Sequence, residues 1–170
     1  MDLGLQDKHA IVTGGSRGIG KAIARELARE GADVAIVARN EADLEATARE
    51  LATETNRRIV PLAADVTSKE QVDRIVAEAA QQLGGLHILV NSGSAPGGSA
   101  TATGPIETVI DEDLLQDFNV KYVGALRCSR AVIPVYEEGG LGAASSTSAA
   151  ATPATPAISA AVSAMPAWCA

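Results

Sequence analysis

The chain has 170 residues and a mass of 17.3 kDa, a length that suits one domain, and 46% of its residues are hydrophobic, which allows a sizeable buried core. A net charge of −7 and an aromatic content of 2% argue against nucleic acid as a partner, whether bound through a basic face or through stacked bases. The two cysteines, Cys128 and Cys169, do not predict a disulfide scaffold or a zinc site, and the histidines lack the spacing of metal ligands. The first residues lack the pattern of a signal peptide. We therefore expect a cytoplasmic location.

Charge divides the sequence into two parts. Every charged residue lies between Asp2 and Glu138, whereas residues 139–170 are rich in Ala, Ser, Thr and Pro and carry no charge. Such a composition is typical of a disordered segment, and its prolines and hydroxyl groups disfavour insertion into a membrane. Residues 1–138 are therefore expected to form the folded part, and residues 139–170 a disordered tail.

The first part alternates apolar strands with amphipathic helices. Strands are expected at 9–13, 33–37, 59–63 and 86–90, and helices at 19–30, 41–54, 68–83 and 111–135, with a loop at 92–104. Strands that are apolar throughout are buried on both faces of a sheet, and strands that alternate with helices form parallel sheets. The fold class predicted is α/β, a doubly wound parallel sheet of the Rossmann type.

A glycine-rich turn joins the first strand to the first helix. In it, Gly14 permits a tight turn, Gly18 lets the backbone approach a pyrophosphate, and Gly20 lets the helix pack closely on the strand. The helix start then offers free N–H groups to the phosphates. Because the glycines follow a strand and open a helix, they predict a dinucleotide site in preference to an ordinary turn. The candidate cofactor-binding residues of this turn are Gly14, Ser16, Arg17, Gly18, Ile19 and Gly20.

The Gly-x-x-x-Gly-x-Gly spacing resembles that of the short-chain dehydrogenase/reductase family, and further matches over residues 5–138 follow in family order. Asp65-Val66 is similar to the pair that contacts the adenine, and Asn91 to Ser94 to the family's Asn-Asn-Ala-Gly, with Ser92, Gly93 and Ser94 as departures. Asn119 resembles the asparagine of the family's catalytic set. The resemblance implies that Asp65, Val66, Asn91 and Gly93 bind the cofactor and that Asn119 is catalytic. Taken singly, Asp65 could cap a turn, Asn91 could satisfy loop backbone and Asn119 could be solvated.

The end of the second strand indicates which nicotinamide cofactor is bound. The residue at this place meets the adenosine ribose, where a carboxylate would repel a 2′-phosphate. Arg39 is a fixed cation whose planar fork matches a phosphate, and Arg17 could supply a second charge. NADP is therefore favoured over NAD, with a solvated surface role for Arg39 as the alternative.

The resemblance also implies a tyrosine followed by a lysine four residues later, and the 170 residues contain no such pair. The last lysine is Lys121, the last tyrosine is Tyr136, and Gly140 stands four residues beyond it. No apolar fifth strand is expected after residue 138. The fold would then be truncated after the fourth strand and its helix, which leaves that strand as a free edge and favours self-association.

Two explanations of residues 139–170 are open. GC-rich codons for the family's usual Gly-Arg-Ile-Val-Asn-Ile-Ser, shifted by one base, encode the residues found at 143–149, which favours a frameshifted reading. The alternative is a real low-complexity tail. Two functions follow: an NADP-dependent oxidoreductase that transfers hydride to or from a small carbonyl or alcohol, with activity of this chain in doubt, or a non-catalytic, truncated cofactor-binding fragment.

Overall fold

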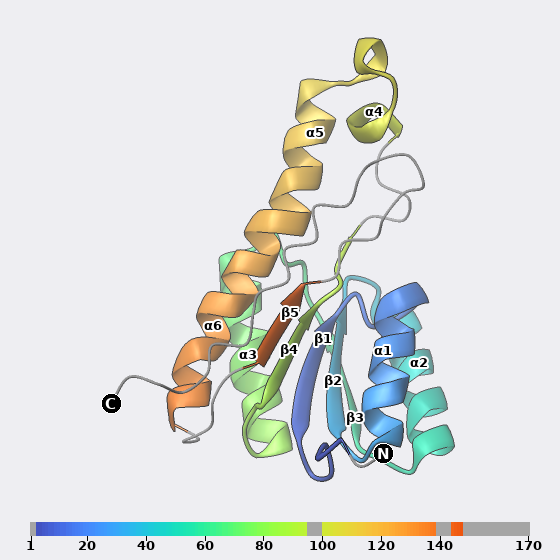
Figure 1. Cartoon of the computed structure of the whole chain (residues 1–170), viewed down its shortest axis with the longest axis vertical. Helices are drawn as coiled ribbons and strands as arrows, with labels where there is room; N and C mark the ends of the chain where they lie inside the picture. The colour runs from blue at the N-terminus through green and yellow to red at the C-terminus, as the bar shows by residue number, and fades with distance from the viewer. Residues whose placement is uncertain (1–2, 95–99, 139–143, 148–170) are drawn as a thin grey trace.

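The computed structural model describes residues 3–94, 100–138 and 144–147, and these form a parallel sheet with helices on both faces (Figure 1). The strand order is β3-β2-β1-β4-β5, as in a doubly wound sheet. The strands are β1 His9–Thr13, β2 Asp33–Ala38, β3 Ile59–Ala63, β4 Ile88–Asn91 and β5 Ala144–Thr147. The helices are α1 Gly18–Arg29, α2 Glu41–Thr55, α3 Lys69–Leu83, α4 Ala100–Thr103, α5 Asp111–Phe118 and α6 Gly124–Glu138, with short turns η1 Ile106–Thr108 and η2 Asn119–Val123.

The central strands supply a core to each face of the sheet. Because successive side chains of a strand point to opposite faces, Ile11 of β1 packs among residues of α3 and α6, while Ala10 and Val12 pack among residues of α1 and α2. These three side chains are buried almost completely. The prediction of strands covered on both faces is therefore confirmed.

Helix α1 approaches the sheet most closely through its small residues. Gly20, Ala24 and Ala28 are buried, and Ile23 and Leu27 are partly buried against the same core. Ile19 is 54% exposed. Small residues allow the helix backbone to approach the sheet closely, and this approach brings the helix N-terminus to the end of β1.

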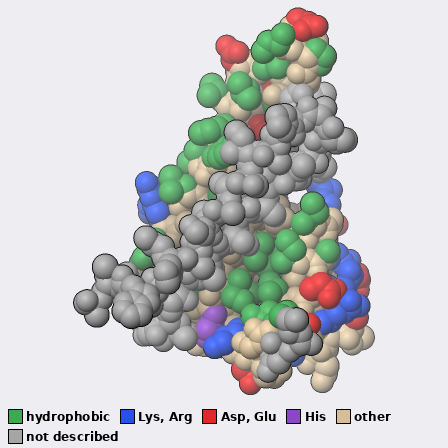
Figure 2. Space-filling model, in the orientation of Figure 1, with side chains coloured by type: hydrophobic (Ala, Val, Ile, Leu, Met, Phe, Trp, Pro, Cys, Tyr) green, Lys and Arg blue, Asp and Glu red, His purple; other side chains and the backbone are tan. Residues whose placement is uncertain are grey.

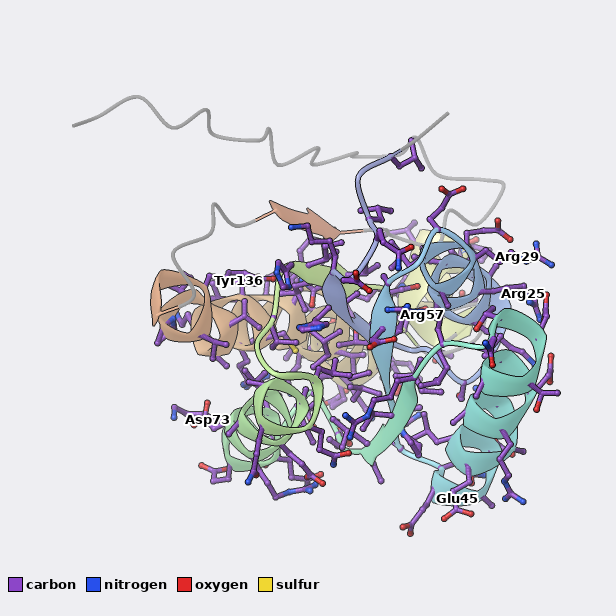
Figure 3. All side chains as sticks on the ribbon, turned by 90° about the horizontal axis from the view of Figure 1, so that it is seen from below. Arg25, Arg29, Glu45, Arg57, Asp73 and Tyr136 are labelled. Carbon is purple, nitrogen blue, oxygen red and sulfur yellow. The ribbon has the colours of Figure 1, made fainter. Side chains whose placement is uncertain are left out.

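Helices α2 and α3 both begin at a residue whose side chain caps the first turn. The Asn40 side chain accepts a hydrogen bond from the backbone N–H of Asp43, and Ser68 does the same for Gln71. Gly84 ends α3 in the left-handed conformation, which a residue without Cβ adopts at little cost. Figure 3 shows Arg25 and Arg29 on the side of α1 next to α2, where both pair with Glu54.

The structure corrects the prediction that no strand follows residue 138. Residues 144–147 form β5, which pairs with β4 in parallel, Asn91 opposite Thr147. The sequence Ala-Ser-Ser-Thr has little strand-like apolar character, and the strand forms because the open edge of β4 supplies backbone partners. The β4 edge predicted to be free is therefore covered along its length. The rest of the predicted tail, 139–143 and 148–170, lies outside the described residues.

A long helical arm follows β4 along the chain. Helix α5, the π-helical turn η2 and helix α6 continue one another from Asp111 to Glu138, and the α5 end extends beyond the sheet (Figure 1). The α6 end packs on α3 and on β4, where Cys128, Val132 and Tyr136 are buried. Among the described helices, none combines the length and the apolar character that a membrane crossing requires.

Candidate cofactor-binding site

A cavity of about 640 Å³ opens at the carboxyl ends of the strands. This is the edge of a doubly wound sheet where ligands bind, because the chain there crosses to helices on opposite faces. Its walls are the glycine turn after β1, the ends of β2 and β3, the loop after β4 and one side of α5. The residues from the predicted set that line it are Gly14, Ser16, Arg17, Gly18, Ile19, Gly20, Arg39, Asp65, Val66 and Gly93.

The glycine turn has the geometry of a phosphate cradle. Gly14 has a positive φ of 69°, and a Cβ there would lie 2.6 Å from the carbonyl oxygen of Ser92. A Cβ on Gly20 would collide with the backbone oxygen of Gly14. Gly18 also has a positive φ, of 56°, but nothing lies within 4 Å of where its Cβ would be. Two glycines thus permit close backbone packing, while the third borders open space at the start of α1.

The first turn of α1 leaves its N–H groups available to a ligand. Arg17 precedes the helix with an extended backbone and makes no side-chain cap, and the first turn carries no acidic residue. The unpaired N–H groups and the helix dipole therefore present partial positive charge to the cavity. Together with the open space at Gly18, this fits the pyrophosphate of a dinucleotide.

Thr13 fastens the loop after β4 to the glycine turn. Its hydroxyl accepts hydrogen bonds from the backbone N–H groups of Ser92, at 3.1 Å, and of Gly93, at 3.0 Å. Thr47 of α2 fixes the other side of the turn, because its hydroxyl donates to the Ser16 carbonyl oxygen at 2.9 Å. Sequence reasoning passed over both threonines. Each is a buried polar residue at a position that the apolar pattern assigns to the core, and that is the signal by which they could have been found.

Charge at the end of β2 is mixed. Arg39 and Arg17 both line the cavity and both are exposed, so their guanidinium groups are free to meet a ligand phosphate. Asp43, in the first turn of α2, also lines this part of the cavity. The carboxylates of Asp43 and Asp65 line the same cavity and offset part of the positive charge of Arg39 and Arg17.

The Asp65–Val66 loop forms the opposite wall. One carboxylate oxygen of Asp65 accepts hydrogen bonds from the backbone N–H and the hydroxyl of Thr67, at 2.9 and 2.8 Å, and the backbone N–H of Asp65 donates to Gln71. Burial alone would raise the pKa of the Asp65 carboxyl, but these hydrogen bonds and the charges of Arg39 and Arg127 lower the pKa below its ordinary value. Asp65 therefore stays ionised, which fixes the shape of the loop.

Both predicted asparagines lie outside the lining of the cavity. Asn91 ends β4 almost completely buried, and its amide nitrogen and oxygen meet no hydrogen-bond partner among the described residues. The Asn119 side-chain oxygen accepts a hydrogen bond from Arg127 at 3.0 Å. Asn119 thus points to a neighbouring arginine, and its catalytic role stays a prediction.

Comparisons with known proteins agree with this geometry. The family model described as short chain dehydrogenase matches residues 8–164. An uncharacterized oxidoreductase of Staphylococcus aureus is 39% identical over 135 residues, which make up 79% of this chain and 54% of the relative. The crystal structure of L-sorbose reductase from Gluconobacter frateurii, complexed with NADPH and L-sorbose, is similar with a TM-score of 0.78 and 35% identity, over 86% of this chain and 54% of that one.

A third match has the same proportions. A short chain dehydrogenase from Burkholderia cenocepacia, in complex with NADP, is similar with a TM-score of 0.72 and 33% identity, over 84% of this chain and 55% of that one. The chain therefore spans about half the length of the relatives it matches.

Proposed function

The chain belongs to the short-chain dehydrogenase family, and we propose that it binds NADP(H) in the cavity at the carboxyl ends of its strands, as the cofactor-binding part of a hydride-transferring oxidoreductase. When bound, the cofactor supplies or accepts the hydride exchanged with a small carbonyl or alcohol substrate. The observation that carries the proposal is the cradle at Gly14, Gly18 and Gly20, where close backbone packing adjoins open space at a helix start.

Different residues of the cavity bind different parts of the cofactor. The N–H groups at the start of α1 hold the pyrophosphate, Asp65 and Val66 form the wall beside the adenine, and Gly93 borders the ribose and nicotinamide half. Arg39 and Arg17 meet the 2′-phosphate that distinguishes NADP from NAD. The bound NADPH and NADP in the two solved relatives support this preference.

The family's acid/base chemistry depends on a Tyr-x-x-x-Lys pair, which these 170 residues do not contain. Tyr136, the last tyrosine, belongs to α6 and is buried in the core, and the last lysine is Lys121. We therefore propose binding without efficient turnover. The alternative explanation is a fragment that serves no catalytic role. It predicts the same lack of turnover, but it does not predict tighter binding of NADPH than of NADH.

Titration calorimetry of the purified chain with NADPH and NADH tests the proposal. Binding of NADPH at least tenfold tighter than NADH is expected from one or two charge-assisted contacts, each worth about 1.5–3 kcal/mol. Carbonyl reduction with NADPH and a panel of ketones should stay near background, since loss of a general acid alone costs about 10²–10⁴-fold in rate. Equal affinity for both cofactors would refute the assignment of Arg39.

We also propose that the chain self-associates, through the arm and not through the sheet edge first expected. A stripe of exposed apolar side chains follows one side of α5, η2 and α6: Leu115, Phe118, Tyr122, Leu126 and Ile133. Phe118 and Tyr122 stack on each other at 4.8 Å between ring centroids. Figure 2 shows hydrophobic side chains gathered over the α5 end of the arm. Water exposure of such a stripe is unfavourable, which supports a protein partner.

A second copy of the chain fits this stripe because its charges are complementary in an antiparallel pairing. Exposed Glu112 lies at the start of the stripe and exposed Arg130 near its end. A two-fold axis near Tyr122 would bring each Glu112 beside Arg130 of the other copy. A cytoplasmic location is consistent with the free, buried thiol of Cys128 and is proposed with the rest.

A further inference from the structure

The side chain of Arg127 joins two elements that the sequence keeps far apart. Its Nη1 atom donates to the Oδ1 atom of Asn119 at 3.0 Å and to the backbone oxygen of Val66 at 3.4 Å. Asn119 is the first residue of η2, which directly precedes α6 on the arm, whereas Val66 belongs to the loop between β3 and α3. A single half-buried guanidinium therefore ties the arm to the wall of the cavity.

The arm also meets this loop by direct packing. A Cβ on Gly124 would lie 2.8 Å from the Cγ2 atom of Val66, so the helix backbone passes closer to Val66 than any side chain at residue 124 would allow. Val66 and Asp65 line the cavity, while Gly124 and Arg127 lie behind them and do not. The loop is thus held from the rear by α6 and from the α3 side by Gln71.

The chemical nature of the pair suits a supporting role. A carboxamide oxygen accepts a hydrogen bond without adding charge, so Asn119 orients the guanidinium of Arg127 and leaves its positive charge uncompensated. That charge acts on the carboxylate of Asp65, which the same arginine helps to keep ionised. A planar guanidinium fork can bridge two oxygen acceptors on separate elements, which an ammonium does less well.

We propose that Arg127 and Asn119 are a positioning pair that fixes the Asp65–Val66 wall of the adenosine half of the cavity. The inference rests on the proposed cofactor site. It adds a structural role for two residues that lie far from Asp65 and Val66 in the sequence. It predicts that both residues control affinity for the adenosine half of the cofactor and leave the nicotinamide half unaffected.

Half-cofactors separate these effects in the intact chain. Calorimetry with 2′,5′-ADP should show about tenfold weaker binding for Arg127→Met and a smaller loss for Asn119→Ala, whereas affinity for nicotinamide mononucleotide should stay unchanged. Arg127→Lys should recover part of the affinity, because the cation remains but the fork is lost. Arg49→Met, which removes an exposed arginine of α2 outside the cavity, is the matched control.

Charge at a distance is the competing explanation, and Asn119→Ala distinguishes it, because this change leaves every charge in place. If Arg127→Met weakens 2′,5′-ADP binding while Asn119→Ala does not, the effect is long-range attraction and the positioning pair is refuted. In the double variant, the losses should be less than additive, since each residue acts through the other. Full additivity would also overturn the proposal.

Amide hydrogen exchange supplies a readout that does not depend on cofactor. The backbone N–H of Thr67, which is bonded to Asp65, should exchange faster in Arg127→Met and Asn119→Ala than in the unchanged chain or in Arg49→Met. If the unchanged chain binds neither half-cofactor, the proposed function fails, but exchange at Thr67 still decides whether the pair holds the loop. Unchanged exchange in both variants would refute the inference.

Discussion

The glycine turn and the helical arm bound the same cavity but are built on opposite principles. The turn achieves its shape through residues that have little or no side chain, so that Gly14 and Gly20 let backbone meet backbone. The arm contributes side chains: Asp113, Gln116, Asp117 and Val120 toward the cavity, and an apolar stripe on its exposed side. A site made from backbone tolerates almost no substitution, whereas a site made from side chains can be altered one property at a time.

The largest effect is expected from Gly20→Val, which tests the backbone-built half. The new side chain would collide with the backbone oxygen of Gly14 and force α1 away from the sheet. Overpacking of this kind costs about 1–3 kcal/mol of stability, and displacement of the helix start should abolish NADPH binding. Thermal unfolding and calorimetry measure the two losses. The matched change Gly18→Ala adds a methyl group into open space, and its cost should be limited to the backbone strain of a positive φ.

Arg39→Asp should reverse the cofactor preference, because it places a carboxylate where a 2′-phosphate is expected to bind. Loss of one charge-assisted contact, at about 1.5–3 kcal/mol, corresponds to roughly 10–100-fold weaker NADPH binding, with NADH binding retained. Titration of both cofactors on the same preparation makes the comparison. A preference for NADPH that survives the change would assign the selectivity elsewhere.

Thr13→Val keeps the shape of the side chain and removes its hydroxyl. The partly buried N–H groups of Ser92 and Gly93 would lose their shared acceptor, and since a fully buried unpaired donor costs about 1–3 kcal/mol, each of these should cost less than that. The free energy of unfolding, measured in urea, should fall accordingly, and cofactor affinity should fall with it. Thr53→Val on the exposed side of α2 is the control, with little change expected.

Leu126→Glu tests the outer side of the arm. An added carboxylate at the centre of the apolar stripe should shift the chain toward monomer without altering the cavity, because Leu126 is exposed and does not line it. Light scattering over a concentration series measures this shift. Identical association by the variant would mean that another surface mediates it.

The smallest effect is expected from Asp43→Asn. Removal of this carboxylate, which lines the cavity together with Arg39, should strengthen NADPH binding a few-fold, since a screened interaction between exposed charges is worth about 0.2–1 kcal/mol. The gain should disappear at high salt. A gain of the same size for NADH would show that Asp43 acts on the shared diphosphate and not on the 2′-phosphate.

The central elements and the glycine cradle could be predicted from the sequence, because both depend on local rules. Apolar runs predicted β1 to β4 to within two residues of each boundary, and Ser68 marked the start of α3 through capping. Strand alternation with helices was sufficient to predict a parallel, doubly wound sheet, because short connections leave few other arrangements.

Contacts between residues far apart in the chain could not be predicted from the sequence, because they depend on how the elements pack. Strand β5 forms on a segment with weak strand propensity because β4 offers it unpaired backbone groups, and Ile19 at the start of α1 is exposed and lines the cavity. The hydroxyl of Thr13 and the guanidinium of Arg127 act on loops far away in sequence. The periodicity of apolar residues indicates which side of a helix or strand is buried. It does not indicate which distant group will form a hydrogen bond with a given side chain.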